Sequence, residues 1–139
     1  MAMVGRSAAM LLPRGDGTFA AIRSRKHGGS FEFPGGKSMV GESDVETARR
    51  EAYEEVGPVV DSRAPLIPLG VFPHVAPDGS FWECAVFVGR YNGGELRSSA
   101  EGDAVWATRE ELLAGTYADL NVEIFASFDA VVAEALRGR

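Results

Sequence analysis

Apolar residues occur along the chain either in short continuous runs, which predict strands, or at helical spacing, which predicts helices. Short apolar runs predict four strands, at residues 4–12, 18–24, 64–75 and 81–91. The turn-rich segment 13–17 joins the first two runs, which predicts a hairpin. Helical spacing of apolar residues follows Ser43 and Asn121. This order favours an α+β fold with a mixed β-sheet between α-helices.

The run that begins at Phe81 is apolar on both of its alternating faces. Such a run is typical of a central strand that is covered on each side. Cys84 lies in it and is the one cysteine of the chain. We therefore expect a buried, inert thiol at this position.

The first helix has clear signals at both ends. Ser43 and Glu46 form a capping box, and Gly57 followed by Pro58 ends the helix. An apolar stripe is predicted along it, made of Val45, Ala48, Ala52 and Val56.

Two further helices are predicted near the C-terminus. Thr108 and Glu111 form a second capping box, which opens a short helix that ends near Gly115. Asn121 is interpreted as the N-cap of the last helix, Val122–Leu136. A loop and a short strand around Trp106 precede them.

Glu51, Glu54 and Glu55 fall within an arc of about 100° beside the stripe of the first helix. Like charges at this spacing weaken a helix, so a divalent cation is a natural partner. Magnesium prefers oxygen ligands of this kind. The alternative is an ordinary solvated helix face, with Arg50 and Glu54 as an i,i+4 pair.

Composition narrows the function classes. The 139 residues predict a single domain, 1–139, and the net charge of −6 argues against binding to a nucleic-acid polymer. A small phosphorylated ligand is still compatible with that charge. No apolar run reaches the roughly 18 residues of a membrane span, and the N-terminus lacks the layout of a signal peptide. We expect a cytoplasmic protein that does not bind membranes.

The spacing of Gly36, Glu42, the segment 50–55 and Gly57 resembles the Nudix box, which here runs from Gly36 to Pro58. Pro58 departs from the family pattern, which usually has an aliphatic residue there. The resemblance implies the Nudix fold and hydrolysis of a nucleoside diphosphate linked to another group. It also implies Mg²⁺, with Mn²⁺ as a substitute.

The resemblance implies roles for particular residues of the box. The metal ligands would be the Gly35 carbonyl, Glu51, Glu54 and Glu55. A carboxylate would accept a proton from water, and Glu54, Glu51 and Glu101 remain open for that role. Glu101 is the candidate for an additional carboxylate that the family often supplies from a later loop. Asp103 and Glu83 are the next candidates after it. Arg50 would orient the glutamates.

Substrate contacts are predicted from charge and position. Arg23, Arg25 and Lys26 end the second strand, either as solvated side chains or as a phosphate clamp, and Arg23 is the preferred candidate. Lys37 would reach phosphate oxygens. Phe81 either stacks on a base or packs in the core. The resemblance to triphosphate pyrophosphohydrolases of the family implies that Asn121 reads a base edge, and the alternative is that it only caps its helix.

The chain is short and resembles the nucleoside triphosphate pyrophosphohydrolase branch of the family near Asn121. Nucleoside triphosphates, cleaved to the monophosphate and pyrophosphate by a monomer or homodimer, are therefore the expected substrates. Pro73 lies sixteen residues after Gly57. A proline at about that distance resembles ADP-ribose pyrophosphatases of the family, so ADP-ribose or another nucleotide diphosphate derivative is the alternative. A nucleotide-binding regulator without activity is the third possibility, although such proteins have typically lost glutamates that this chain keeps.

Overall fold

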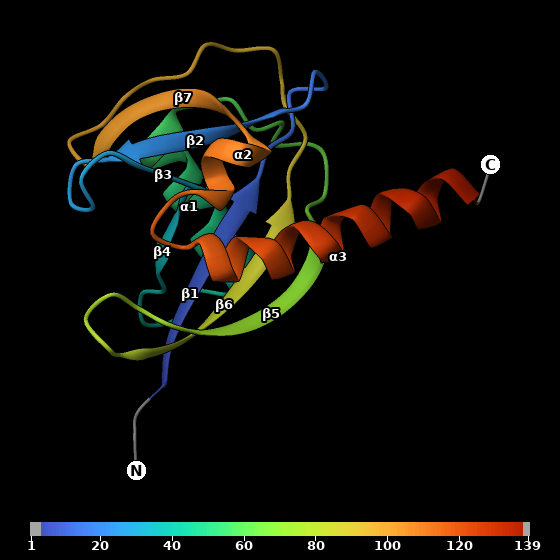
Figure 1. The fold of residues 1–139 in the computed structure, drawn as a ribbon. Helices are drawn as coiled ribbons and strands as arrows, with labels where there is room; N and C mark the ends of the chain where they lie inside the picture. Colours follow the sequence, from blue (N-terminus) through green and yellow to red (C-terminus); the bar gives the residue numbers. More distant parts are fainter. Residues whose placement is uncertain (1–3, 138–139) are drawn as a thin grey trace.

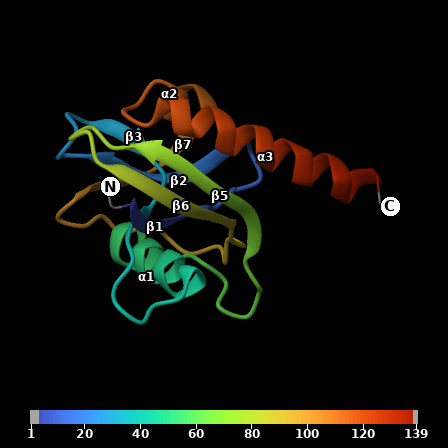
Figure 2. The ribbon, with the colours of Figure 1, turned by 90° about the horizontal axis from the view of Figure 1, so that it is seen from below.

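The computed structural model describes residues 4–137 and arranges them in layers. One helix, α1 (Asp44–Val56), covers one side of the strands, and α2 (Arg109–Leu113) and α3 (Ala118–Arg137) cover the other (Figures 1 and 2). The α+β fold with helices on both sides of mixed β-structure is therefore confirmed.

The strands form two sheets. The first has the order β4-β1-β6-β5 and contains β1 (Val4–Leu11), β4 (Gly35–Lys37), β5 (Ile67–Val75) and β6 (Phe81–Val88). It is mixed, because β1 runs parallel to β6 and antiparallel to β4. The second is antiparallel, with the order β3-β2-β7, and contains β2 (Thr18–Ser24), β3 (Ser30–Glu32) and β7 (Gly102–Thr108).

The prediction that the first two strands pair as a hairpin is wrong. β1 and β2 lie in different sheets and meet through an isolated bridge between Pro13 and Phe19. Proline has no N–H group to continue a ladder, and β1 instead pairs with β4 and β6. The short strands β3 and β4 were not predicted, because two glycines precede β3 and two lie within β4, and glycine is depleted in strands.

β6 is central, as predicted. Cys84 and Val86 pack on one face with residues of α3, whereas Ala85 and Phe87 pack on the other face with residues of α1. The Cys84 side chain is buried, and burial raises the pKa of its thiol.

Both capping boxes are confirmed. The Ser43 hydroxyl accepts from the Glu46 N–H, and the Thr108 hydroxyl accepts from the Glu111 N–H. Gly57 ends α1 with a positive φ of 95°. The predicted apolar stripe of this helix is wrong at Val45, which is 39% exposed and lies outside the core. Thr47, which was not part of the predicted stripe, is fully buried.

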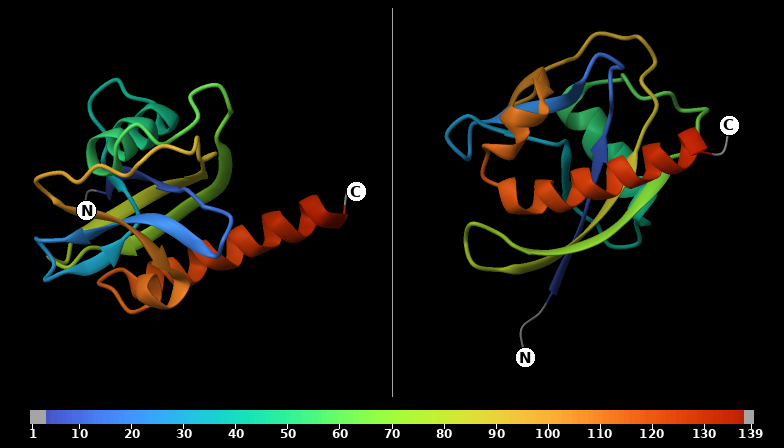
Figure 3. Two further views of the ribbon diagram at one scale, coloured as in Figure 1. Left: turned by 90° about the horizontal axis from the view of Figure 1, so that it is seen from above. Right: turned by 45° about the vertical axis from the view of Figure 1, so that its right-hand side comes forward.

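The last helix starts earlier than predicted. α3 begins at Ala118, so Asn121 is not its N-cap but a buried residue of its first turn. Its C-terminal part extends past the sheets (Figures 1 and 3). None of the helices described is both long enough and apolar enough to cross a membrane.

Candidate active site

Two adjacent glycines after a proline predict a turn at Gly35 and Gly36, but the structure has none there, which corrects that prediction. They belong to β4 and pair with Ala9 and Ala8 of β1, and neither has a positive φ. A Cβ atom on Gly36 would lie 2.6 Å from Cδ of Glu51, and one on Gly35 would lie 2.7 Å from the Ala8 carbonyl oxygen. The two glycines therefore allow close approach between β4, β1 and α1.

Glu55 is the most deeply placed of the three glutamates, at 2% exposure. Its Oε1 atom accepts a hydrogen bond of 2.7 Å from the Gly35 N–H. Burial, together with the nearby Glu101 carboxyl group, raises the pKa of Glu55 to about 10. The sequence placed this side chain only at the edge of the core.

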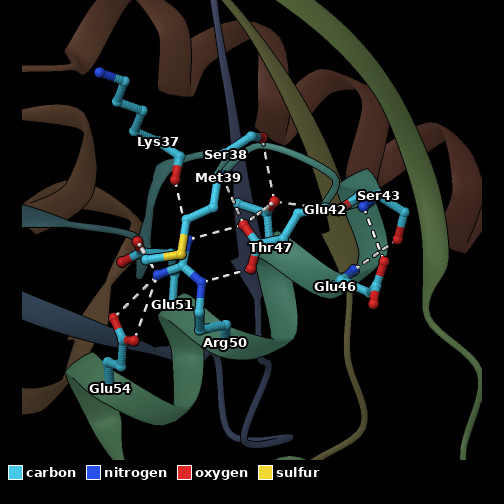
Figure 4. A network of polar contacts seen from close by, with 10 residues as sticks. All are labelled: Lys37, Ser38, Met39, Glu42, Ser43, Glu46, Thr47, Arg50, Glu51 and Glu54. Atoms are coloured by element: carbon cyan, nitrogen blue, oxygen red, sulfur yellow. Dashed lines mark hydrogen bonds and ion pairs between the residues drawn. The ribbon is translucent and has the colours of Figure 1, made fainter.

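Arg50 is the centre of a polar network (Figure 4). Its Nε atom donates to Glu42 Oε2 at 2.6 Å, and its Nη1 atom lies 2.9 Å from Glu51 Oε1 and 3.2 Å from Glu54 Oε2. Nη2 donates to the Lys37 carbonyl oxygen at 3.0 Å. The Arg50 hydrogen bond holds the pKa of Glu42 down at about 2. Arg50 thus joins the loop before α1 to two glutamates of the helix.

The glutamates differ in their access to water. The Glu51 side chain is 12% exposed and that of Glu54 is 51% exposed. Burial raises the pKa of Glu51, with the charges of Glu54 and Glu101 as smaller causes. Among residues 4–137, no three Asp, Glu, His or Cys side chains are arranged to hold a metal ion. Protein groups partner these carboxylates instead, chiefly the Arg50 guanidinium.

Glu101 comes from the loop before β7 and meets α1 at Glu55. The charge of Glu101 also acts on Glu51, as does that of Glu54. Asp103 lies elsewhere, 3.7 Å from Arg25, and Glu83 acts electrostatically on Arg6.

The predicted phosphate-binding cations are not directed at the carboxylates. The Arg23 guanidinium lies over the Phe31 ring, 5.6 Å from its centroid. Lys37 is exposed, and Figure 4 shows its side chain extending away from Arg50 and the glutamates.

The two predicted base-contacting residues also lie apart from the carboxylates. Asn121 is 2% exposed, and its Nδ2 atom donates to the Leu112 carbonyl oxygen at 2.9 Å, which links α3 to α2. Phe81 is 50% exposed and lines an open hollow of about 420 Å³ with Val4 and Trp82.

A polar and aromatic cluster was missed in the sequence. Tyr117 contacts His27 and His74 edge-on, with ring centroids 5.8 Å and 5.9 Å apart. His27 Nδ1 lies 2.7 Å from Glu32 Oε2. Burial raises the pKa of the Tyr117 hydroxyl. The only sequence signal was the pair of histidines, because these residues come from three distant segments and no spacing connects them.

Comparison with known proteins places the chain among related folds. A family model described as "NUDIX domain" matches residues 3–128. A search of curated proteins gave no match.

Several solved structures are similar. A NUDIX hydrolase from Nitrosomonas europaea has 19% identity and a TM-score of 0.73, covering 92% of this chain and 90% of its own. A MutT protein from Bacillus halodurans has 26% identity and a TM-score of 0.67, covering 87% and 80%. An Ap4A hydrolase from C. elegans has 18% identity and a TM-score of 0.73, covering 94% and 99%.

Proposed function

The chain belongs to the NUDIX domain family, and from this premise we propose that it is a pyrophosphohydrolase that converts nucleoside triphosphates to the monophosphate and pyrophosphate. Pyrophosphohydrolysis of nucleotide derivatives is the activity of this family. The choice of triphosphates is the specific proposal. The observation that supports hydrolysis best is the convergence of Glu51, Glu54, Glu55 and Glu101 around the close contact between β4 and α1.

Nudix hydrolases generally need a divalent metal, usually Mg²⁺, and the donor chemistry here fits one. The charges of Glu54 and Glu101 act on Glu51 and that of Glu101 acts on Glu55, and burial adds to this crowding of charge by disfavouring the charged forms of Glu51 and Glu55. A hard cation would relieve that crowding, and we propose Glu51, Glu54, Glu55 and the Gly35 carbonyl as its ligands. Mg²⁺, or Mn²⁺ in its place, neutralises phosphate charge and lowers the pKa of water when bound.

Glu54 is our candidate for the proton acceptor. Its side chain is 51% exposed, whereas Glu51 is 12% exposed and Glu55 is buried. A general base must reach the water whose proton it takes. Arg50 contacts both Glu51 and Glu54 through Nη1, so it would fix the orientation of both carboxylates.

For the nucleoside end of the substrate we propose the cluster of Tyr117, His27, His74 and Glu32. Its rings offer an aromatic surface to a base, and the Glu32 carboxylate and the histidine nitrogens offer hydrogen-bonding groups. Tyr117 lies one turn before Asn121, whose amide nitrogen already donates to Leu112. Base reading by Asn121 remains a prediction that Asn121→Ser would test through base preference.

ADP-ribose hydrolysis is the second candidate, favoured by Pro73 in β5. The C. elegans neighbour is named for Ap4A, a dinucleotide substrate. The rings of Tyr117, His27 and His74 form one cluster, which suits a substrate with a single base better than a dinucleotide. A regulator that only binds nucleotides is disfavoured, since every glutamate of the box is present.

The test is a substrate panel with Mg²⁺: the common nucleoside triphosphates, ADP-ribose, Ap4A and nucleotide sugars, with chromatographic identification of the products. We expect the highest kcat/KM for a triphosphate, with pyrophosphate released. Glu54→Gln should lower turnover at least about a hundredfold, as expected for one acid–base group. Release of orthophosphate from every triphosphate, or a preference for ADP-ribose, would contradict the proposed substrate class.

A further inference from the structure

We propose that Arg25 is a positioning residue, which holds the loop that bears Glu101 against α1 and thereby keeps the Glu101 carboxyl beside Glu55. This inference rests on the proposed function. It assigns no substrate contact to Arg25, although its place at the end of β2 suggested a phosphate clamp.

Arg25 contacts the residues on either side of Glu101 as well as Glu101 itself. Its N–H donates to the Glu101 carbonyl oxygen at 3.0 Å, and its Nη1 atom donates to the Ala100 carbonyl oxygen at 3.1 Å. Its Nη2 atom lies 3.7 Å from Asp103 Oδ1. One residue therefore contacts the loop at residues 100, 101 and 103, on both sides of the Glu101 side chain.

The other end of this loop is attached to α1. The Arg97 N–H donates to the Val56 carbonyl oxygen at 2.8 Å, and the Arg97 guanidinium lies over the Tyr53 ring, 5.2 Å from its centroid. Between Arg97 and Gly102 the chain closes a turn, with hydrogen bonds in both directions between Ser99 and Gly102. Only a short segment is left whose position depends on Arg25.

The charge of the site explains why this segment needs holding. The charge of Glu101 acts on Glu51, and like charges at short range repel each other. The loop is exposed, so water could replace the Arg25 side chain as a hydrogen-bond donor to Ala100. The exposed pair with Asp103 contributes little energy. We infer that the side chain of Arg25 determines where Glu101 lies more than how stable the protein is.

The substitution Arg25→Ala separates these effects, because it keeps the backbone hydrogen bond to Glu101 and removes only the side-chain contacts. Arg25→Lys retains a positive charge and a donor. Arg137→Ala is the matched control, since Arg137 makes an exposed ion pair with Glu134 at the far end of α3. Each variant is compared with Glu101→Gln and with the double variant Arg25→Ala/Glu101→Gln.

Mn²⁺ affinity without substrate, from electron paramagnetic resonance, is measured together with kcat, KM and melting temperature. We expect Arg25→Ala to weaken Mn²⁺ binding and lower kcat by about tenfold, the range for groups that orient metal ligands. KM and the melting temperature should stay near the wild-type values. Arg25→Lys should recover most of the loss, and the double variant should equal Glu101→Gln.

Other outcomes would overturn the proposal. An increase in KM with unchanged Mn²⁺ affinity would assign Arg25 to the substrate phosphates. The full effect of Arg25→Ala in the Glu101→Gln background, or wild-type behaviour of Arg25→Ala, would show that Arg25 does not act through Glu101. Because Mn²⁺ binding is measured without nucleotide, it separates failure of this inference from an error in the substrate class.

Discussion

At the scale of single residues, the site depends on two glycines, which have no side chain. Gly36 gives the Glu51 carboxyl group the space that a Cβ atom would take, and Gly35 gives the same space to the backbone of β1. The two adjacent glycines therefore have different neighbours, one a movable side chain and the other fixed main chain.

Gly36→Ala should keep the fold and damage the function. The added Cβ would lie 2.6 to 2.8 Å from the end of the Glu51 side chain, which can rotate away but then leaves Arg50. We expect turnover to fall about 10- to 100-fold with a small change in melting temperature. Gly35→Ala meets the Ala8 carbonyl oxygen and Ala9 Cα, which cannot move independently, so it should lower the melting temperature. Equal losses of stability in both variants would contradict this distinction.

The three helical glutamates were predictable, because a helix of known start fixes which residues share an arc. The burial of Glu55 was not, since it depends on an N–H donor from β4. Asn121 was misjudged because asparagine favours N-caps, whereas here a partner in another helix, the Leu112 carbonyl, determines its position.

At the scale of elements, one ion pair joins β1 to the start of α1. Arg6 Nε and Nη2 donate to the two carboxylate oxygens of Asp44 at 3.0 and 2.7 Å. The Arg6 guanidinium lowers the pKa of Asp44 from its ordinary value. Because the pKa is lower in the folded state, the pair stabilises the fold above the unfolded pKa, and this contribution is lost as pH falls through the folded pKa.

Arg6→Met should therefore destabilise the protein in a pH-dependent way. The side chains of Arg6 and Asp44 are 40% and 34% exposed, so the loss at pH 7 should be at most about 1 kcal/mol in the free energy of unfolding. Urea unfolding at pH 7, 5 and 3 measures it. The difference from wild type should be constant between pH 7 and 5 and should shrink at pH 3, below the usual Asp pKa of about 3.9. A difference that is the same at all three pH values would exclude the ion pair as its cause.

At the scale of the whole molecule, α3 is anchored at one end only. Ile124 and Phe125 are buried against the core, whereas Val132 is 40% and Leu136 is 63% exposed where the helix passes the sheets (Figure 3). The stability of the fold should therefore depend on the first half of this helix.

Truncation after Asp129 should change the free energy of unfolding by less than about 1 kcal/mol, because residues with few buried contacts open at little cost. Phe125→Ala is the comparison in the anchored half and should cost about 3 to 5 kcal/mol. Denaturant unfolding of the two variants measures both values. A truncation as damaging as Phe125→Ala would mean that the outer half is covered in solution, for example by a second copy of the chain.

β5 ends the four-stranded sheet, and Val71 and Val75 of this strand are exposed. A long apolar strand at a sheet edge can template the strands of other molecules. Pro68 and Pro73 supply no N–H groups to such a template, and the irregular register between Pro68 and Gly70 bends the strand. The prolines of β5, whatever they mean for substrate choice, thus give this edge protection against intermolecular aggregation.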